Sequence, residues 1–443
     1  MKKQDYQHLV ERIRHKINNW TCRFLSYAGR LQLIKAVLMS LVNFWAAVFR
    51  LPSQCIKEVE SLCSAFLWSG PELKTTGAKV AWKDVCQLKS EGGLGIRSLK
   101  EVNKVYGLKL IWRMSTGKSL WCKWIEENLL RKKSFWEVKS KTQTGSWMWR
   151  KLLKLRDIAK MFYMKEIGSG CHTFFWYDKW SDRGALIDIL GERGIIDMGI
   201  GREATVEEAS LSSRRKRRHR TELLKDIEAE LTEVGNRLCI EKEDVSLWRR
   251  ESGYKQEFST HETWSILRVT KTHHSWSRGV WFSQATPKYA FMTWLALLNR
   301  LSTMDRVARW SQGADTICVL CKTAQETRDH LFFECSYSSQ IWGSLVKGIL
   351  KETYTNEWKD IVIWISDEKM ERMRLFCIRY AFQIALYTLW RERNKVRHEE
   401  KLMPIEVLKK LVDKGVRNKL SLMRSKKVRG MEKELQFWFS KRL

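Results

Sequence analysis

The chain has 443 residues, with 81 lysines and arginines against 50 aspartates and glutamates, which gives a formal net charge of +31. This length allows two to four domains at roughly 100–200 residues each, and a hydrophobic content of 44% excludes a wholly disordered chain. The positive excess is larger than solubility requires and is typical of proteins that bind RNA, DNA or an anionic surface. A basic protein without such a partner is the alternative.

The cysteines and the first residues indicate the compartment. The chain contains 11 cysteines, an odd number, and its start, "MKKQDYQHLVERIRHKINNW", has no apolar signal core. We therefore expect an intracellular, reducing location with free or metal-bound thiols, and both nucleus and cytoplasm stay open. The longest apolar run, residues 36–49, is shorter than a bilayer span, which predicts a buried helix and no membrane partner.

Helical periodicity dominates the first 165 residues, and the chain holds only four prolines to interrupt it. Ser26 is a candidate N-cap for a helix that continues to about residue 45, and Ser53 for the next helix. We predict a mainly α fold: a helical N-terminal region (1–165), a small zinc-knuckle α/β module and a basic helical C-terminal tail.

Residues 166–200 are predicted to form a small β-rich element, because Gly168 and Gly170 interrupt a β-prone stretch as a hairpin would. Residues 201–245 are predicted to be a basic linker. Its run of positive charge has two readings, a solvated surface segment or a patch for nuclear import or phosphate contact. In the second reading the contacting residues are Arg214, Arg215, Lys216, Arg217, Arg218 and Arg220.

Residues 246–350 are predicted to be a compact domain with a short strand pair, a helix capped by Ser259 or Thr260, and an apolar helix after Pro287. In residues 351–443 we expect a long buried helix over 372–393 and an amphipathic helix that begins at Pro404. Residues 401–443 hold 13 basic and 4 acidic side chains, so this tail is strongly cationic.

The stretch "CVLCKTAQETRDHLFFEC" carries the chemistry, with the spacing C-x2-C-x8-H-x4-C. A C-x2-C turn directs two thiolates to one point, and a histidine and a cysteine from the next segment can complete a tetrahedron. We predict a structural Zn²⁺ site with ligands Cys318, Cys321, His330 and Cys335. A chance cluster is the alternative, and the apolar "LFF" before Cys335 must pack on a core while both its flanks reach the metal.

Several enzyme signatures are missing from the sequence. It has no Asp-Asp dipeptide of the kind found in a polymerase palm, and no HExxH, P-loop, GxSxG or GxGxxG motif. Its acidic residues are scattered, whereas two-metal phosphoryl chemistry needs clustered carboxylates. The sequence therefore predicts a protein that is not an enzyme.

The order of motifs resembles a known family. "VWFSQATPKYAFMTWLALLNRLSTMDRVARW" followed by "CVLCKTAQETRDHLFFECSYSSQIW" closely resembles the zinc-binding domain that follows the reverse transcriptase in plant non-LTR (LINE-type) retroelements. The stretches "INNWTCRFLSYAGRLQLIKAVL", "AWKDVCQLKSEGGLGIRSL" and "LWRERNKVRH" resemble the same elements, so that residues 1–165 look like the post-polymerase segment. Leu88 departs from this pattern, which usually has proline there.

The palm and endonuclease of such elements lie outside this chain, so the resemblance implies contact with nucleic acid and not catalysis. Besides the charged run, the candidate phosphate contacts are Lys288, Arg300, Arg306 and Arg309, and Trp281 or Trp310 would either stack on bases or belong to the core. The leading interpretation is a non-catalytic, zinc-dependent nucleic-acid-binding fragment. The alternatives are a zinc-stabilised protein-interaction module, with a protein partner, or the product of a decayed element without maintained function; the oligomeric state stays open.

Overall fold

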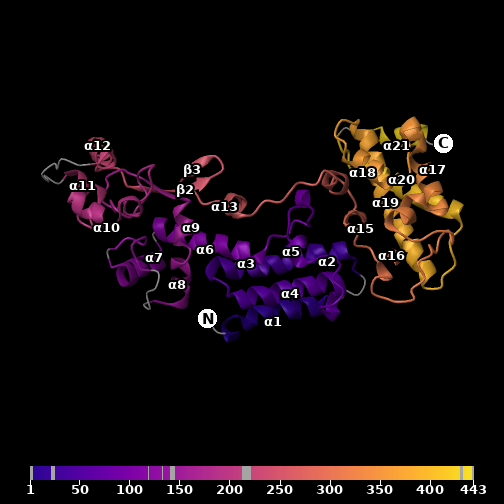
Figure 1. The fold of residues 1–443 in the computed structure, drawn as a ribbon, viewed down its shortest axis with the longest axis horizontal. Helices are drawn as coiled ribbons and strands as arrows, with labels where there is room; N and C mark the ends of the chain where they lie inside the picture. Colours follow the sequence, from indigo (N-terminus) through magenta and orange to yellow (C-terminus); the bar gives the residue numbers. More distant parts are fainter. Residues whose placement is uncertain are drawn as a thin grey trace. The chain divides into compact units, whose positions relative to one another are not determined.

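The computed structural model describes residues 3–20, 25–117, 119–131, 133–139, 145–211, 221–429 and 433–441. As predicted, the fold is mainly helical, and the described residues include a sheet of three short strands. The chain forms two compact units, each built from three separate segments (Figure 1). Unit 1 contains Met1–Ile13, Met39–Val59 and Ser98–Thr270, and unit 2 contains Arg14–Leu38, Glu60–Arg97 and Lys271–Leu443. The five regions drawn from the sequence divide the chain differently, and their boundaries remain predictions.

Two helices contribute residues to both units: α1 (Lys3–Asn19) and α4 (Ser53–Ser69). The remaining elements of unit 1 are α3 (Met39–Val48), α6 (Leu99–Thr116), α7 (Leu120–Ile125), the π-helical turn η5 (Glu126–Leu130), α8 (Trp147–Leu153), α9 (Arg156–Lys160), β1 (Tyr163–Glu166), α10 (Leu186–Met198), α11 (Val206–Leu211), α12 (Glu222–Arg237), β2 (Val245–Arg250), β3 (Gly253–Lys255) and α13 (Thr260–Leu267).

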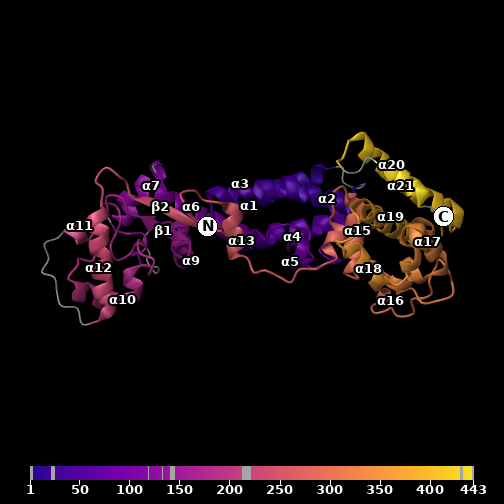
Figure 2. The same cartoon turned by 90° about the horizontal axis from the view of Figure 1, so that it is seen from above.

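The remaining elements of unit 2 are α2 (Tyr27–Leu33), the π-helical turn η2 (Ile34–Leu38), the 3₁₀ turns η3 (Gly70–Glu72) and η4 (Lys89–Glu91), α5 (Trp82–Val85), α14 (Ser277–Val280), α15 (Pro287–Leu297), α16 (Met304–Val307), the π-helical turn η6 (His330–Glu334), α17 (Ser336–Leu350), the 3₁₀ turn η7 (Lys351–Thr353), α18 (Trp358–Ser366), α19 (Arg372–Arg397), α20 (Ile405–Ser425) and α21 (Glu434–Ser440). Helix α19 is the centre of this unit, because α15, α17, α18 and α20 all pack against it (Figure 2).

The sheet belongs to unit 1 and is antiparallel throughout, in the order β1-β2-β3. Tyr163 is opposite Trp248, and Trp248 is opposite Lys255. Of the strand pair predicted after residue 250, one strand, β3, lies in that stretch, whereas its partner β2 lies before it, at Val245–Arg250. Ser259 caps the helix that follows and accepts a hydrogen bond from the Glu262 N–H, also as predicted.

The hairpin predicted around Gly168 and Gly170 is wrong. The strand β1 ends at Glu166, and the next residues wrap around the carboxylate of Asp244. That carboxylate accepts hydrogen bonds from the backbone N–H groups of Gly168, Gly170 and His172, at 2.8–3.1 Å. These N–H groups are therefore satisfied by a distant side chain and not by a partner strand. Most of 186–198 is helical, so the region 166–200 is not β-rich.

Many tryptophans in the described residues lie in the cores with a partner for the indole N–H. Trp248 is fully buried, stacks on Phe162 at 5.4 Å between ring centroids, and donates to the hydroxyl of Thr263. In unit 2, Trp294 is fully buried and donates to the carbonyl of Gly92 at 2.8 Å. Burying an indole removes a large apolar area from water, and the hydrogen bond compensates its one polar atom. These tryptophans account for part of the unusual composition.

The apolar stretch near the N-terminus is longer than its sequence suggests. One continuous helical segment, Tyr27–Val48, has 22 residues and contains an 18-residue window with a mean hydropathy of 1.7, so it is long and apolar enough to cross a bilayer by length and composition. The core helix of a soluble protein passes the same test. The apolar run identified in the sequence, residues 36–49, is shorter because the charged Lys35 bounds it. In the structure the Lys35 side chain donates to the carbonyl of Leu94, and the helix continues through this residue. The absence of a membrane partner stays a prediction.

Candidate metal centre

A tight turn brings Cys318 and Cys321 together. Residues Ile317 and Gln325 form an antiparallel bridge, and the Cys318 N–H donates to the carbonyl of Ala324 at 2.8 Å. At the far end the Lys322 N–H donates to the carbonyl of Cys318 at 2.8 Å. The backbone of this small loop therefore fixes both sulfur atoms on one side before any metal is considered.

His330 and Cys335 are joined by a single π-helical turn, η6. The Cys335 N–H donates to the carbonyl of His330, five residues earlier, at 2.8 Å. A turn of this length places the first and the sixth residue on the same side, which matches the four residues between the histidine and the cysteine. The intervening apolar residues point the other way: Phe333 is fully buried and stacks on Phe382 of α19 at 5.6 Å. The π turn thus lets "LFF" pack on the core while its flanks face the metal position.

The four predicted ligands meet at one point. One ligand atom from each of Cys318, Cys321, His330 and Cys335 lies within 4.8 Å of every other, and Cys321 Sγ is 3.3 Å from His330 Nε2. Sulfur ligands at about 2.3 Å from a tetrahedral Zn²⁺ lie roughly 3.8 Å apart, so a cluster of this size can close around one ion. Cys318 and Cys335 are buried, while Cys321 and His330 are half-buried. Three thiols and an imidazole are the donor set that zinc prefers, and the residues fit it.

The thiols differ in their readiness to ionise. A hydrogen bond from Cys318 lowers the pKa of Cys335 to about 5 and outweighs burial, with the Ser338 and Tyr337 N–H groups adding to the effect. The same hydrogen bond raises the pKa of Cys318. Cys335 is the N-cap of α17, where free N–H groups favour a negative charge. A thiolate is therefore available at Cys335, as a metal ligand must be.

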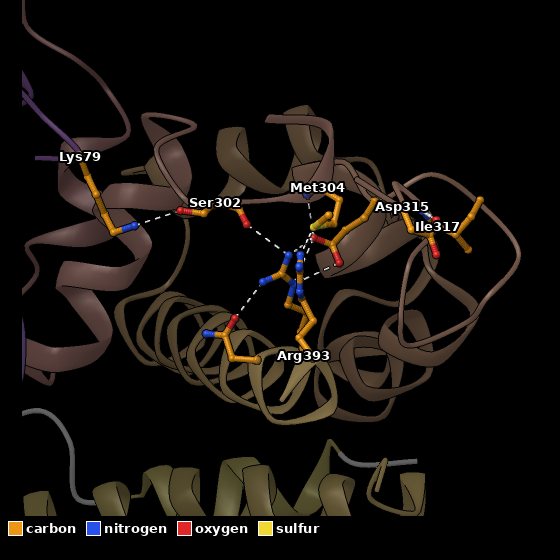
Figure 3. A network of polar contacts seen from close by, with 9 residues as sticks. Lys79, Ser302, Met304, Asp315, Ile317 and Arg393 are labelled. Atoms are coloured by element: carbon orange, nitrogen blue, oxygen red, sulfur yellow. Dashed lines mark hydrogen bonds and ion pairs between the residues drawn. The ribbon is translucent and has the colours of Figure 1, made fainter. Parts of the chain in front are cut away.

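A buried ion pair that the sequence did not suggest anchors this loop. Arg393 of α19 binds the carboxylate of Glu326, which lies between Cys321 and His330, with Arg393 Nη2 2.6 Å from Glu326 Oε1. Both side chains are at most 5% exposed. Figure 3 shows Arg393 in this network, where it also donates to the carbonyl of Ser302. Glu326 lies in a polar stretch of the sequence, and only the folded chain shows that Arg393, 67 residues later, supplies its partner.

Glu326 also connects the Cys/His loop to α16. Its carboxylate accepts a hydrogen bond from the Met304 N–H at 3.0 Å, and its carbonyl accepts one from the Asp305 N–H at 3.1 Å. Both donors belong to the first turn of α16, whose N–H groups have no partner within the helix. The loop therefore fixes the position of α16, the helix that carries Arg306.

Three of the predicted phosphate contacts lie close together. Burial lowers the pKa of Arg306, and the nearby charges of Arg300 and Arg309 lower it further. Burial also lowers the pKa of Lys79, and the charge of Arg306 adds to that effect. We call Arg300, Arg306, Arg309 and the neighbouring Lys79 the arginine cluster. Trp310, next to Arg309, is 64% exposed. Positive charge beside an exposed indole is a combination that suits nucleic acid.

The other candidates lie elsewhere. Lys288 is exposed near the beginning of α15, whereas Arg300 follows the end of that helix, so they lie at opposite ends of α15. Trp281 is half-buried under the ammonium group of Lys89, at 4.6 Å, which favours the structural reading for this residue. Six candidates of the charged run fall outside the described residues: Arg214, Arg215, Lys216, Arg217, Arg218 and Arg220.

Comparison with known proteins agrees with this geometry. Residues 258–342 match the model of a family described as zinc-binding in reverse transcriptase. The chain is 25% identical over 402 residues to an Arabidopsis thaliana protein named "Putative ribonuclease H protein", covering 88% of this chain and 63% of that protein. It is 29% identical over 144 residues to an "Uncharacterized mitochondrial protein" of the same plant, covering 32% of this chain and 93% of that protein. The matched residues 258–342 contain all four candidate ligands, so this part of the chain is similar to the zinc-binding family of reverse transcriptases, and the chain as a whole is distantly similar to these two plant proteins.

Proposed function

We propose that this chain is a non-catalytic nucleic-acid-binding protein whose zinc domain is ordered by one structural Zn²⁺. The ligands would be Cys318, Cys321, His330 and Cys335, which leave no coordination position open for a substrate. When bound, the ion supplies cross-linking of two loops; a formed zinc site contributes on the order of 10–16 kcal/mol in small zinc modules. Thiolate ligands need a reducing environment, which supports an intracellular location.

The observation that carries the proposal is the double hydrogen bond of Glu326 to α16. Because the same loop holds the ligands and fixes Met304 and Asp305, the metal would set the position of the adjacent Arg306. The arginine cluster would contact phosphates, and Trp310 could receive a base. Phosphate contacts made by a pre-positioned guanidinium lose less side-chain entropy than contacts made by a mobile one.

The proposal of a role without catalysis rests on the arrangement of acidic groups. In the part of the chain that the structure describes, the only cluster of three or more histidine, cysteine or acidic side chains that could hold a metal is the Cys/His site. The name of the Arabidopsis relative mentions ribonuclease H, and this chain spans 63% of that protein's length. Incubation of the purified chain with an RNA·DNA hybrid and with a primed template checks this part, and cleavage or primer extension above background would overturn it.

The central experiment measures binding of a fluorescent single-stranded RNA across a salt series, for the zinc-loaded and the chelator-treated chain. We expect log K to fall linearly with log salt, by about 0.7 per phosphate contact, and zinc removal to weaken binding. The variant Cys318→Ser should behave like the metal-free chain, whereas Cys239→Ser, at an exposed cysteine outside the site, should behave like the parent chain.

A flat salt response, or equal affinity with and without zinc, would contradict the proposal. A protein that stays bound to the chain after nuclease treatment, together with no measurable RNA binding, would instead favour the protein-interaction alternative.

A further inference from the structure

Helices α15, α19 and α20 enclose a cavity of about 310 Å³ on unit 2. Tyr387 lines it and also lines two adjoining cavities of about 320 and 390 Å³. Lys288 is shared with one of these neighbours, and Arg391 and Lys395 with the other. The three cavities therefore adjoin one another, and we call them together the α15–α19–α20 groove. Volumes of this size are those of sites that hold a small molecule or part of a polymer.

The central cavity is cationic. Four basic side chains from three helices line it: Lys288, Arg391, Lys395 and Lys414. Among the described residues, no carboxylate lies within ion-pair distance of Lys288, Arg391 or Lys414, whereas Lys395 pairs with Glu400 at 3.3 Å. An anion that enters the cavity is attracted by all four of these positive charges.

The acidic residue of the central cavity is already engaged. Glu392 is 3% exposed, and its Oε1 accepts a hydrogen bond from the Met403 N–H at 2.8 Å. Among the described residues this buried carboxylate forms no ion pair with Lys288, Arg391 or Lys414, and the four cations outnumber it in the lining of the cavity. A single solvated cation at a surface needs no partner. Several cations that line the same cavity form a site that can bind an anion.

Aromatic rings form the other part of the wall. Tyr289 and Tyr387 lie 4.9 Å apart between ring centroids, and the ammonium group of Lys288 is 5.1 Å and 5.2 Å from them. The hydroxyl of Tyr380, the next ring in this row, hydrogen-bonds to Thr286 at 3.0 Å. The groove thus offers both cations for phosphates and a half-buried ring, Tyr387, for the face of a base.

We infer that the α15–α19–α20 groove is the site where this chain holds a single-stranded segment of nucleic acid, with phosphates at Lys288, Arg391 and Lys414 and a base against Tyr387. This inference rests on the proposed nucleic-acid-binding function and gives it a location. A duplex keeps its bases stacked inside, so that only a single strand can present a phosphate and a base face to one cavity.

The groove is connected to the zinc domain through Met403. The Tyr337 hydroxyl, two residues after the ligand Cys335, donates to the Met403 carbonyl at 2.7 Å, while Glu392 binds the Met403 N–H. Met403 lies directly before Pro404, the N-cap of α20. The metal site, α17 and the third wall of the groove therefore form one chain of contacts. Loss of zinc should loosen this wall as well as the arginine cluster.

The test compares two charge-matched variants of the full, zinc-loaded chain. The groove variant carries Lys288→Gln, Arg391→Gln and Lys414→Gln. The control carries Lys347→Gln, Lys359→Gln and Lys369→Gln, at three exposed lysines of the same unit outside the groove. The probes are a fluorescent oligouridine strand and a duplex RNA of equal length, and zinc content and circular dichroism check that each variant is folded.

Loss of three phosphate contacts should make the slope of log K against log salt for oligouridine shallower by about 2 in the groove variant. The ratio of parent affinity to variant affinity should therefore be about 100-fold larger at 0.1 M salt than at 1 M salt. The salt slope of the control variant should differ from that of the parent chain by less than about 0.7, the value for one phosphate contact. A separate variant, Tyr387→Leu, should weaken oligouridine binding by about tenfold without changing the salt slope, because it removes stacking and no charge.

Each outcome is decisive. Equal loss in the groove variant and the control, or a loss that is the same for duplex and single strand, overturns the assignment of this groove while the proposed function stands. Failure of the parent chain to bind RNA overturns both. Retention of an acidic protein, and not of oligouridine, by the parent chain would contradict both proposals, and loss of that retention in the groove variant but not in the control would identify the groove as a protein-docking surface instead.

Discussion

Arg393 Nη2 lies 2.6 Å from Glu326 Oε1, and this contact joins the loop between the candidate zinc ligands to α19, the longest of the described helices. The pair is almost completely buried. Arg393 Nε also lies 3.1 Å from both carboxylate oxygens, and the guanidinium covers the ring of Trp390 at 4.9 Å. A buried pair with this many partners is costly to break on one side, since the remaining charge has no water to solvate it.

Removal of either partner should therefore destabilise unit 2. We expect Arg393→Met or Glu326→Leu to lower the free energy of unfolding by about 3–5 kcal/mol, and the double variant to recover a large part of that loss, because neither charge is then left alone. Urea unfolding of the four proteins in a double-mutant cycle gives the coupling. Single variants that each cost less than 1 kcal/mol would show that water reaches the pair.

Asp244 should stabilise unit 1 in a pH-dependent way. Burial raises the pKa of this carboxyl, but hydrogen bonds from the Thr173 hydroxyl and from the backbone N–H groups of Gly170, Gly168 and His172 outweigh it, so the pKa is lowered. A lowered folded-state pKa gives stability that is present above about pH 4, the ordinary value for aspartate, and is lost as the pH falls through the folded-state value.

The variant Asp244→Asn checks this. At pH 7 it should unfold about 2 kcal/mol more easily, because charge-assisted hydrogen bonds are replaced by weaker ones. The difference from the parent chain should shrink as the pH is lowered from 5 to 2. Hydrogen exchange of residues 167–174 reports on the loop itself. An unchanged exchange rate in that loop at pH 7 would mean that Asp244 does not hold it.

Lys35 should give a pH dependence of the same sign, but in the alkaline range. Burial, with the charge of Lys89 adding to it, lowers the pKa of Lys35 from 10.5 to about 8. Below pH 8 the folded chain carries the full cost of the buried charge, and between pH 8 and 10.5 only the unfolded chain is protonated there, so stability relative to a neutral variant rises with pH.

We expect the free energy of unfolding of the parent chain, minus that of Lys35→Met, to be constant below pH 8 and to increase above it by at most a few kcal/mol. Thermal unfolding from pH 7 to 10 measures it. The subtraction removes the contribution of other groups, such as the buried Cys63, whose pKa is raised to about 12 by burial. A difference that stays constant over the whole range would mean that the amine keeps its charge in the folded chain.

Leu88 marks a position where proline should stabilise the chain. Its φ is −61° and its ψ is 154°, values that a proline ring adopts without strain. Among the hydrogen bonds of the described residues, the Leu88 carbonyl accepts from Glu91 and Gly93, and none is donated by the Leu88 N–H. Leu88→Pro should raise the free energy of unfolding by about 0.4–1 kcal/mol, chiefly by restricting the unfolded chain. Urea unfolding with a Leu88→Ala control separates this effect from the loss of the half-buried side chain.

The sequence by itself determined the features that depend on local spacing. The interval between His330 and Cys335 equals one π turn, the turn between Cys318 and Cys321 closes on its own backbone, and Ser26 and Ser259 cap the helices that follow them. Periodicity also predicted the extent of α19 and the beginning of α20 to within a few residues. Such features can be predicted because neighbours along the chain settle them.

Only the tertiary structure decided which distant residues meet. Arg393 reaches Glu326 across 67 positions, and Asp244 binds a loop more than 70 positions earlier in place of the expected hairpin. The α15–α19–α20 groove likewise collects Lys288, Arg391 and Lys414 from three helices. The local sequence around a polar residue is the same whether its hydrogen-bond partner is water or a distant residue. Which of the two it binds is decided only when the chain packs.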